Sequence, residues 1–404
     1  MSETGTPPSP IVIAGAGIGG LTAALTLRRA GHEIVLIDKA KALSEVGAGL
    51  QLSPNACSVL DGFGLLQDLK ALGHQPDNLR VWSGKTGDQI SKVRLGSYLL
   101  ERHGQPFIVI HRADLQGTLL KKVEATDGIK LMLGTALTDA KTGDAGNLVC
   151  TYQAGETTGT LNCKALIGAD GVWSTVRRLI PNHKNARFSG QVAYRSTLPI
   201  DKIPAKWRKD SGLWLHRDSH LVHYPIRSGE QLNIVALATE DWQDETWSAP
   251  AGKDELLHRF KDWPTDIRNL LNGPERWLKW ALCTVDANGP WTHGQIALLG
   301  DAAHAMLPYM AQGAAMAIED AAELASHFPV ETENTAAALR AYERTRKPRA
   351  ERIQETGFKN AKTFHMSGLP ATARDMVMKF SKPESLAARF DYVYGWKPNQ
   401  ALPS

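Results

Sequence analysis

The chain has 404 residues, 43% of them apolar, and its 46 basic and 42 acidic residues leave a net charge of +4. This composition indicates a folded protein with one large core or two smaller ones, and excludes a fibrous or largely disordered chain. The basic residues form no sustained tract, which argues against nucleic-acid binding, and no apolar run is long enough to cross a bilayer.

The four cysteines, Cys57, Cys150, Cys163 and Cys283, lie far apart and form no C-x-x-C pair. This spacing argues against a structural zinc site, a redox dithiol and a disulfide framework, so no metal is expected. The first ten residues are polar and contain prolines, without the basic and apolar regions of a signal peptide. We therefore expect a cytoplasmic protein.

The first element pattern is a strand at residues 11–14, a glycine-rich turn, a helix at 21–30 and a second strand at 34–37 that ends in Asp38. The turn has the spacing Gly15-x-Gly17-x-x-Gly20. In such a unit Gly15 permits the tight turn, Gly17 lets the backbone approach a pyrophosphate, and Gly20 lets the helix pack closely on the strand. Asp38 can accept hydrogen bonds from ribose hydroxyls, so the unit predicts a dinucleotide site rather than a plain structural turn.

The next segments mix short strands and helices. Ser53 has the character of an N-cap for a helix running towards residue 65. Strand patterns at 79–82 and 90–95 predict a hairpin, and a strand at 107–111 precedes a helix at 113–124. An apolar strand at 165–168 then ends in Asp170-Gly171.

Between residues 189 and 285 the pattern changes to alternating or β-branched strands, at 191–198, 213–216, 220–224 and 232–238. This region predicts an antiparallel sheet, interrupted by two short helices at 254–261 and 265–271. On the third of these strands His220, Val222 and Tyr224 alternate, so their side chains should share one face, while His223 points to the other.

An apolar run at 296–299 ends abruptly in Gly300-Asp301, and a helix rich in small residues follows Gln312-Gly313. An isolated carboxylate at a strand end and an open helix N-terminus suit a polyhydroxylated, partly anionic cofactor. The alternatives are an ordinary turn and a helix that merely packs closely. A long helix is predicted at 335–364, with Pro348 kinking it or starting a second helix. The final forty residues show no regular pattern.

These motifs together resemble the class A flavin-dependent aromatic hydroxylases. The resemblance is carried by the three glycines of the first turn, Asp170-Gly171 and Gly300-Asp301 in this order, and by the shorter matches Glu45 to Gly49, His111-Arg112-x-Asp114 and Met310 to Ala314. Within the class the chain is similar to the branch acting on small hydroxy-aromatic acids, such as salicylate, 3-hydroxybenzoate and 6-hydroxynicotinate hydroxylases.

The resemblance implies an α/β fold with a discontinuous Rossmann-like FAD-binding domain, an inserted antiparallel-sheet substrate domain and a C-terminal helix. The FAD-binding domain is expected at 1–75, 100–185 and 286–345, the substrate domain at 76–99 and 186–285, and a C-terminal helical segment at 346–404. The implied activity is hydroxylation of a phenolic or hydroxypyridine acid through a flavin C4a-hydroperoxide, with O2 and transiently bound NADH or NADPH as co-substrates. A monomer or homodimer is expected.

The resemblance also implies residue roles. The expected cofactor-binding residues are Gly15, Gly17, Gly20, Asp38, Gly49, Arg112, Asp170, Gly171, Gly300, Asp301, Gln312, Gly313 and Ala314. Asp38 departs from the glutamate usual in the family. His220 is expected to assist deprotonation of the substrate hydroxyl, with Tyr224 lining the pocket, because a histidine titrates near neutrality and an ionised phenol is a stronger nucleophile. Pro308, Tyr309 and Met310 are expected to line the substrate pocket.

Two other functions stay open. The first is an FAD monooxygenase for a larger quinone-, polyketide- or antibiotic-like substrate, which would have less need of His220. The second is a flavin-binding sensor without turnover. For His216, His223 and His304 a structural role is favoured over a catalytic one.

Overall fold

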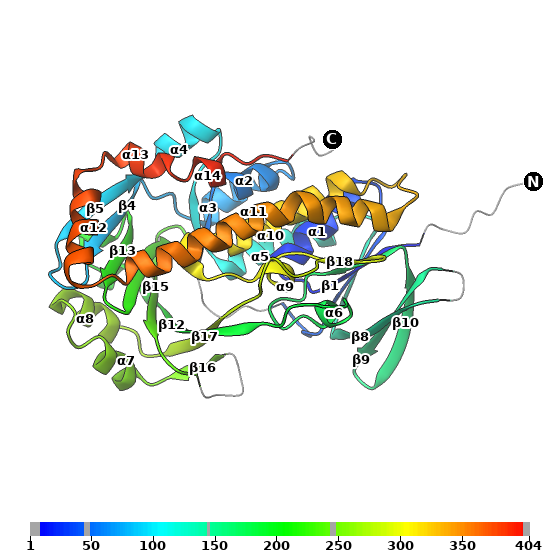
Figure 1. Ribbon diagram of the computed structural model, residues 1–404, viewed down its shortest axis with the longest axis horizontal. Coiled ribbons are helices and arrows are strands. Elements are labelled where there is room, and N and C mark those ends of the chain that lie inside the picture. Colours follow the sequence, from blue (N-terminus) through cyan, green and yellow to red (C-terminus); the bar gives the residue numbers. More distant parts are fainter. Residues whose placement is uncertain (1–8, 44–48, 144–145, 243–247, 399–404) are drawn as a thin grey trace, which may run out of the picture.

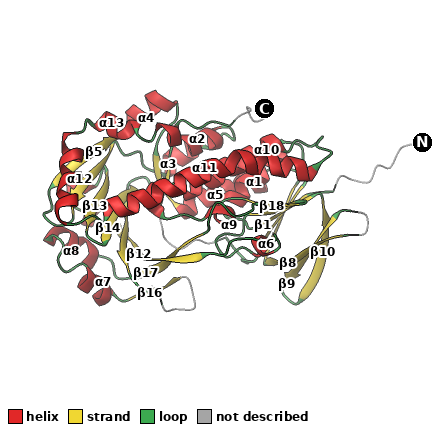
Figure 2. Ribbon diagram, in the orientation of Figure 1, coloured by secondary structure: helices red, strands yellow, loops and turns green. Residues whose placement is uncertain are grey.

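The computed structural model describes residues 9–43, 49–143, 146–242 and 248–398, and residues 45–48 of the family match therefore lie outside the described part. Helices and a small sheet surround a parallel sheet in one half of the molecule, and a large sheet forms the other half (Figures 1 and 2). The predicted α/β class is confirmed, because a mixed set of strands and helices forms both halves.

The first half is built on a six-stranded sheet. In spatial order its strands are β18 (Thr292–His293), β19 (Ile296–Leu298), β11 (Ala165–Gly168), β1 (Ile11–Ala14), β2 (Ile34–Asp38) and β7 (Ile129–Leu133). All pairs are parallel except β18 with β19. The adjacent strands β19, β11 and β1 are buried throughout because both faces of a parallel sheet are covered. Strands β1, β11 and β19 come from three distant parts of the chain and lie side by side in this sheet. The first half is therefore discontinuous in sequence, as predicted.

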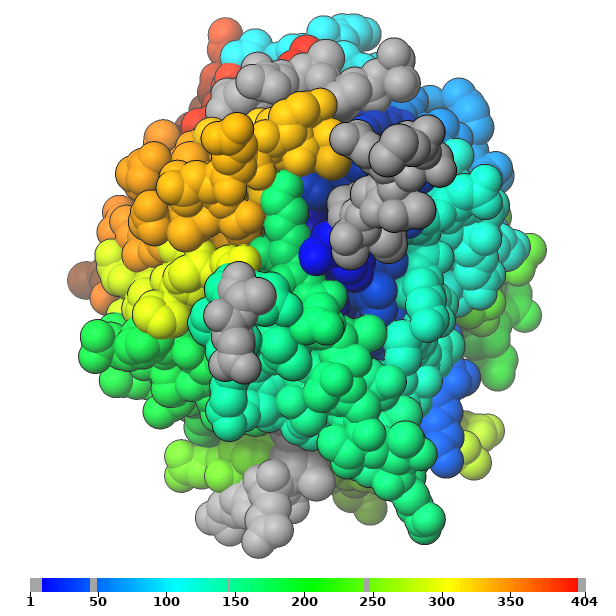
Figure 3. Space-filling view, turned by 90° about the vertical axis from the view of Figure 1, so that its right-hand side faces the viewer, coloured from blue at the N-terminus to red at the C-terminus, as the bar shows by residue number. Residues whose placement is uncertain are grey.

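One face of this sheet carries α1 (Ile18–Arg29), α5 (Arg112–Glu124) and α10 (Gly313–His327), and the other carries the strands β8 (Thr135–Thr142), β9 (Leu148–Ala154) and β10 (Thr157–Cys163). When the molecule is turned by 90° from the view of Figure 1, blue residues of the first unit lie in a recess between orange residues and cyan-to-green residues (Figure 3). The recess follows from the layering, because later segments cover the first strands from both sides.

The second half is an eight-stranded sheet. Its order is β16 (Ser248–Ala251), β17 (Trp277–Thr284), β12 (Arg187–Pro199), β15 (Gln231–Thr239), β14 (Ser219–Ile226), β13 (Ser211–His216), β4 (Asn78–Ser83) and β5 (Gln89–Arg94). The predicted hairpin at 79–95 thus extends this sheet. The sheet was expected to be antiparallel, and it is so except between β4 and β13, which are parallel. That pairing joins strands over 120 residues apart, which periodicity does not encode.

The two predicted short helices, α7 (Lys253–Arg259) and α8 (Thr265–Asn272), cover one face of the large sheet with an apolar core that includes Trp214, Phe260 and Ile267. Residues of the opposite face, among them His220, Val222 and Tyr224 of β14, line a cavity. The remaining elements are β3 (Gly49–Leu52), β6 (Ile108–His111), α2 (Pro54–Asp61), α3 (Leu66–Leu72), α4 (Gly96–His103), α6 (Thr175–Arg178), α9 (Asp301–His304) and the 3-10 turns η1 (Ile200–Lys202), η2 (Ala205–Trp207) and η3 (Pro308–Met310).

The long helix α11 (Thr335–Phe364) is continuous, with Pro348 inside it. It runs across both halves of the molecule (Figure 1). The expectation that the last forty residues are irregular is wrong, because α12 (Gly368–Phe380), α13 (Pro383–Ala388) and α14 (Asp391–Tyr394) follow. Leu369, Val377 and Phe380 of α12 are exposed. The apolar residues of this helix therefore do not form a single buried face, and a buried face at 3.6-residue spacing is the pattern by which a helix is predicted.

Two buried carboxylates on α10 join the first half, which is built on the six-stranded sheet, to α11. Asp320 accepts hydrogen bonds from the Gly300 backbone N–H at 2.9 Å and from Arg346 Nε at 2.7 Å, and its Oδ2 lies 2.6 Å from His304 Nε2. Burial alone would raise the pKa of Asp320, but His304 and Arg346 reverse that effect and lower the pKa to about 2. The Gly300 turn is therefore fixed by a carboxylate that stays ionised.

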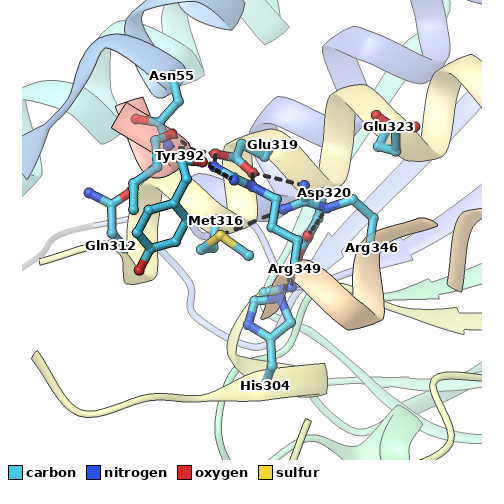
Figure 4. A network of polar contacts seen from close by, with 12 residues as sticks. Asn55, His304, Gln312, Met316, Glu319, Asp320, Glu323, Arg346, Arg349 and Tyr392 are labelled. Atoms are coloured by element: carbon cyan, nitrogen blue, oxygen red, sulfur yellow. Dashed lines mark hydrogen bonds and ion pairs between the residues drawn. The ribbon is translucent and has the colours of Figure 1, made fainter. Parts of the chain in front are cut away.

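The neighbouring Glu319 is held in the same way (Figure 4). Arg346 Nη1 lies 2.8 Å from Glu319 Oε2, and Arg349 donates from Nε and Nη2, each at 2.7 Å. Asn55 Nδ2 donates to Glu319 Oε1 at 2.5 Å, which ties α2 to the cluster. Arg349 also donates to the Tyr392 and Val393 carbonyls, which anchors α14. We call Asp320, Glu319, Arg346 and Arg349 the buried ion network.

Replacing Arg346 by Met should lower the free energy of unfolding by about 3–5 kcal/mol, because two buried carboxylates would lose one shared cation. Urea unfolding followed by circular dichroism measures this loss. Arg340→Met, at an exposed position of the same helix, is the control and should change stability by no more than about 0.5 kcal/mol. A loss below about 1 kcal/mol for Arg346→Met would contradict a structural role for the network.

Candidate active site

The glycine turn between β1 and α1 contributes two kinds of glycine. A Cβ on Gly15 would lie 2.4 Å from the Ala169 carbonyl oxygen, and one on Gly20 would lie 1.8 Å from the Gly15 carbonyl oxygen. Both positions therefore need glycine for packing. A Cβ on Gly17 would meet nothing within 4 Å, and Gly17 lines a cavity of about 500 Å³.

Asp38 ends β2 beside that turn and lines the same cavity. Its carboxylate accepts hydrogen bonds from the backbone N–H of Ala16 at 2.6 Å and of Ala40 at 2.8 Å. A carboxylate offers about four acceptor positions, so the two backbone bonds fix its orientation while leaving acceptors for hydroxyl donors. The geometry suits a vicinal diol such as a ribose.

The ends of β11 and β19 supply the neighbouring wall. Asp170 lines the cavity and accepts hydrogen bonds from Ser174 Oγ and from the backbone N–H groups of Thr175 and Val176, so it also caps α6. Gly171, at φ +75°, has open space where a Cβ would stand. Asp301, the first residue of α9, is exposed towards the cavity.

The N-terminus of the fifteen-residue helix α10 also reaches the cavity, through Gly313 and Ala314. A Cβ on Gly313 would meet nothing within 4 Å, so the first amides of the helix are open to a ligand. The helix dipole favours negative charge at this point. Gln312 was expected beside these residues, but its side chain is buried and donates to Ser53 Oγ at 2.9 Å.

One face of the large sheet closes the cavity. Register places Leu237 opposite His220 and Val235 opposite Val222, and these four side chains line the cavity together with Tyr224, as period-two alternation predicts. His223 lies on the other face, 5.5 Å from the Trp207 ring, and burial lowers the pKa of His223 to about 3.

Gly49 fits against this wall. A Cβ there would lie 2.6 Å from the Tyr224 ring, and the Gly49 N–H donates to Asn233 Oδ1 at 2.8 Å. Burial raises the pKa of Tyr224, so its hydroxyl stays protonated. A tyrosine that stays protonated can donate a hydrogen bond but cannot act as a base.

His220 is 2% exposed, and burial and the neighbouring His365 hold the pKa of His220 well below its usual value. Its Nδ1 lies 3.0 Å from Nε2 of His365, and its Nε2 has no hydrogen-bond partner among the described residues. A neutral imidazole with one free nitrogen can accept a proton from a ligand in the cavity.

The three residues of η3 have different positions. Pro308 lines the cavity. Tyr309 is buried behind His220, with ring centroids 4.8 Å apart, and donates from its hydroxyl to Gln191 Oε1 at 2.7 Å. Met310 is buried, and its sulfur lies 3.0 Å from Asn360 Nδ2 of α11.

The structure thus brings most of the expected residues to one cavity and leaves four outside its lining. The lining includes Gly15, Gly17, Asp38, Gly49, Arg112, Asp170, Gly171, His220, Tyr224, Gly300, Asp301, Pro308, Gly313 and Ala314. The four outside are Gly20, Tyr309, Met310 and Gln312.

Two residues that sequence reasoning missed belong to this site. Arg195 lines the cavity from β12, where register places it opposite Val235, and its guanidinium lies 4.7 Å from the centre of the Trp280 ring. His365, at the end of α11, contacts His220. The alternation in the strand at 191–198 shows which side chains lie on the same face as Arg195. It does not show which of the two faces meets the cavity.

The residues present fit a dinucleotide with a flavin ring. The cavity has glycines with free space at two of its walls, fixed carboxylates at strand ends that suit hydroxyl groups, and a helix N-terminus that suits an anion. Among the described residues no group of three or more His, Cys, Asp or Glu side chains is placed to hold a metal ion.

Comparison with known proteins points in the same direction. A family model described as an FAD binding domain matches residues 9–356. The chain is 36% identical to 3-hydroxybenzoate 6-hydroxylase 1 of Aquipseudomonas alcaligenes over 95% of this chain and 97% of the relative. It is 31% identical to 6-hydroxynicotinate 3-monooxygenase of Pseudomonas fluorescens, over 87% and 90% of the two chains.

A solved structure titled as a salicylate hydroxylase substrate complex has a TM-score of 0.80 at 24% identity, and the match covers 96% of each chain. This likeness extends over both sheets, so it supports the whole fold and not the nucleotide half alone. In the described part of the chain, no helix has the length and apolar character that a membrane span requires.

Proposed function

The chain belongs to the FAD binding domain family, and we propose that it is a monooxygenase that uses FAD, NADH or NADPH, and O2 to hydroxylate a small hydroxy-aromatic acid. One observation carries the proposal: the cavity that starts at the glycine turn ends at a sheet face bearing a neutral histidine and an arginine. The proposed nucleotide site and the proposed aromatic-acid site therefore share one cavity.

In this proposal Gly15 and Gly17 admit the pyrophosphate of FAD, Asp38 accepts from its adenosine ribose, and Asp301 accepts from its ribityl chain. The amides at Gly313 and Ala314 would hold the flavin ring and stabilise negative charge on it. Bound FAD supplies the chemistry that takes a hydride from the nicotinamide and activates O2 for transfer of one oxygen atom.

His220 handles the substrate proton. Its free Nε2 accepts the proton of the aromatic hydroxyl, which makes the ring carbons ortho and para to that oxygen stronger nucleophiles. Tyr224, four residues along the same strand and on the same face, stays protonated and can donate to the resulting oxyanion. The buried position of His220 also excludes water from the proton-transfer site.

Arg195 binds the carboxylate of the substrate. Strand β15 separates β12, which carries Arg195, from β14. Register places Arg195 in line with Val222 of β14, at a backbone separation of about 10 Å. The Arg195 side chain points into the cavity. A guanidinium pairs with a carboxylate through a planar fork of donors. Arg195 and His220 line the same cavity from two strands of one sheet, so one aromatic ring can meet Arg195 with its carboxylate and His220 with its hydroxyl.

We assign 1–75, 100–185 and 286–345 to FAD binding, 76–99 and 186–285 to the substrate domain and 346–404 to a C-terminal helical segment, supported by the pairing of strands in two separate sheets. We propose that the enzyme works in the cytoplasm as a monomer or homodimer, with a small aromatic molecule as its partner.

Purified protein should bind FAD and turn yellow, and a hydroxylated aromatic acid should accelerate its oxidation of NADH or NADPH. A panel of 3-hydroxybenzoate, salicylate and 6-hydroxynicotinate, with benzoate as a control without a hydroxyl, measures this by loss of nicotinamide absorbance against peroxide release. Slow oxidation unaffected by any hydroxy acid would favour a flavin-binding sensor. Stimulation only by quinone or polyketide compounds would favour the larger-substrate alternative.

Replacing His220 by Gln should lower kcat at pH 7 by about 10²-fold or more while FAD affinity stays within about threefold, because the proton acceptor is lost. In the wild type, kcat should not fall between pH 7 and 6, since the pKa of His220 is held well below its usual value. His216→Gln, on the neighbouring strand and outside the cavity lining, is the control. Unchanged turnover in His220→Gln would remove the base assignment.

Replacing Arg195 by Gln should raise KM for a hydroxy-aromatic acid by roughly 10- to 100-fold, the worth of a hydrogen bond to a charged group. KM for the matching phenol without a carboxylate should change less than about threefold. Arg187→Gln, at an exposed position of the same strand, is the control. An equal rise of KM for the acid and the phenol would show that Arg195 shapes the cavity without binding the carboxylate.

A further inference from the structure

The side of His220 that faces away from the cavity contacts a second histidine. His365 Nε2 lies 3.0 Å from His220 Nδ1, and the two ring centroids are 5.2 Å apart. His365 does not line the cavity and is partly exposed at the molecular surface. The pair therefore connects the buried end of the cavity to solvent.

The position of His365 is fixed by two helices. It caps the C-terminus of α11, and its N–H donates to the Ala361 carbonyl at 3.3 Å. Arg374 of α12 donates from Nη1 to the carbonyls of Thr363 at 2.8 Å and Phe364 at 3.0 Å, which are the last turn of α11. The end of the helix is thus tied down one residue before His365.

The aromatic neighbours fix the two rings. The His220 ring lies 5.6 Å from the Phe364 ring and 4.8 Å from the Tyr309 ring, and the His365 ring lies 5.7 Å from Tyr309. Tyr309 is itself held by Gln191. Both imidazoles are consequently restrained at hydrogen-bonding distance in the folded protein.

The charged and titratable groups that face His365 come from four elements. They are His220 on β14, Tyr309 on η3, Asp218 in the turn before β14 and Arg374 on α12. Burial lowers the pKa of His365 to about 4, with Arg374 acting in the same direction and Asp218 opposing it. Both histidines are therefore neutral at pH 7, and one hydrogen atom is shared between the facing nitrogens.

We propose that His365 is a positioning residue that accepts the Nδ1 hydrogen bond of His220, leaves Nε2 of His220 bare towards the cavity, and passes the substrate proton to solvent. This inference rests on the proposed function. The tautomer of an imidazole is set by the hydrogen bond that its other nitrogen makes. An accepting Nε2 on His365 selects the one tautomer of His220 that can act as a base.

The proton steps balance. The substrate O–H bond breaks as its proton moves to His220 Nε2, the His220 Nδ1–H proton moves to His365 Nε2, and the His365 Nδ1–H proton moves to water. The aromatic oxygen keeps the electron pair, so the net change is one phenolate in the cavity and one proton in solvent. When the product oxygen is reprotonated, the same steps in reverse restore both tautomers.

The first test is independent of substrate. Nitrogen NMR of FAD-loaded enzyme carrying 15N-histidine reports which ring nitrogen of His220 bears hydrogen, and His220→Gln assigns the signals. Wild type and His365→Gln should both show the Nδ1–H form, because a glutamine carbonyl can accept the same bond. His365→Phe, which retains the ring contacts, should show a larger Nε2–H population. An unchanged tautomer in His365→Phe would overturn the positioning role.

The second test uses 3-hydroxybenzoate as the probe at pH 7, with 6-hydroxynicotinate and salicylate as further probes. His365→Phe and His365→Gln should each lower kcat on the order of tenfold or more while KM stays within about threefold, since neither side chain passes a proton on. Activity should recover as pH rises towards about 10, where phenols ionise in solution. His216→Phe is the control and should follow the wild type.

Wild-type activity of His365→Gln at pH 7 would overturn the proton pathway. If no probe stimulates the wild-type enzyme, the proposed function fails instead, while the NMR measurement still decides the arrangement of the two histidines. The two failures are therefore distinguishable.

Discussion

The buried ion network between α10 and α11 contacts α2, the Gly300 turn and α9 as well as its own two helices. Buried ionised side chains are stable only if each has its partners, and here each carboxylate of the pair Glu319 and Asp320 meets at least one guanidinium and one further donor. Their partners come from α2, the Gly300 turn, α9 and α11. The network thereby fixes, at once, several segments that border the cavity.

Helix α11 carries this constraint to the other side of the site. Arg346 and Arg349 lie in its middle, and His365 follows its last residue, about 28 Å along the helix axis from Arg346 at 1.5 Å per residue. One continuous helix thus links the segment that would meet the flavin ring to the histidine behind His220. The two halves of the molecule have different sheets, but one continuous helix, α11, sets the distance between their functional groups.

What could be predicted from the sequence was local. The first strand, glycine turn, helix and acid fall within thirty residues, so their spacing alone describes the unit, and period-two alternation placed His220 and Tyr224 on one face. Arg195 and His365 could not be found in this way. Arg195 reaches the cavity only through the register of β12 on β15, and His365 meets His220 from 145 positions later in the chain. The periodicity of a sequence shows which side chains share a face, but not which other part of the chain packs against that face. For the same reason Gln312 and Met310 were expected at the cavity, whereas their side chains are turned away from it.

The electrostatics of the site contain an apparent conflict, and the geometry resolves it. A phenol has a pKa near 10 and an unperturbed histidine one near 6.5, so proton transfer to imidazole is uphill by about 5 kcal/mol, and burial that lowers the pKa of His220 makes it harder. Such a base cannot store the proton. It can pass the proton on, provided that a second neutral imidazole leads to water and that a hydrogen-bond donor stabilises the oxyanion left behind. In the proposed reaction Tyr224, which stays protonated, donates to that oxyanion on the cavity side, and His365 supplies the outlet on the other. A weakly basic His220 is therefore suited to a site in which the anion is held by the cavity and the proton is released to solvent.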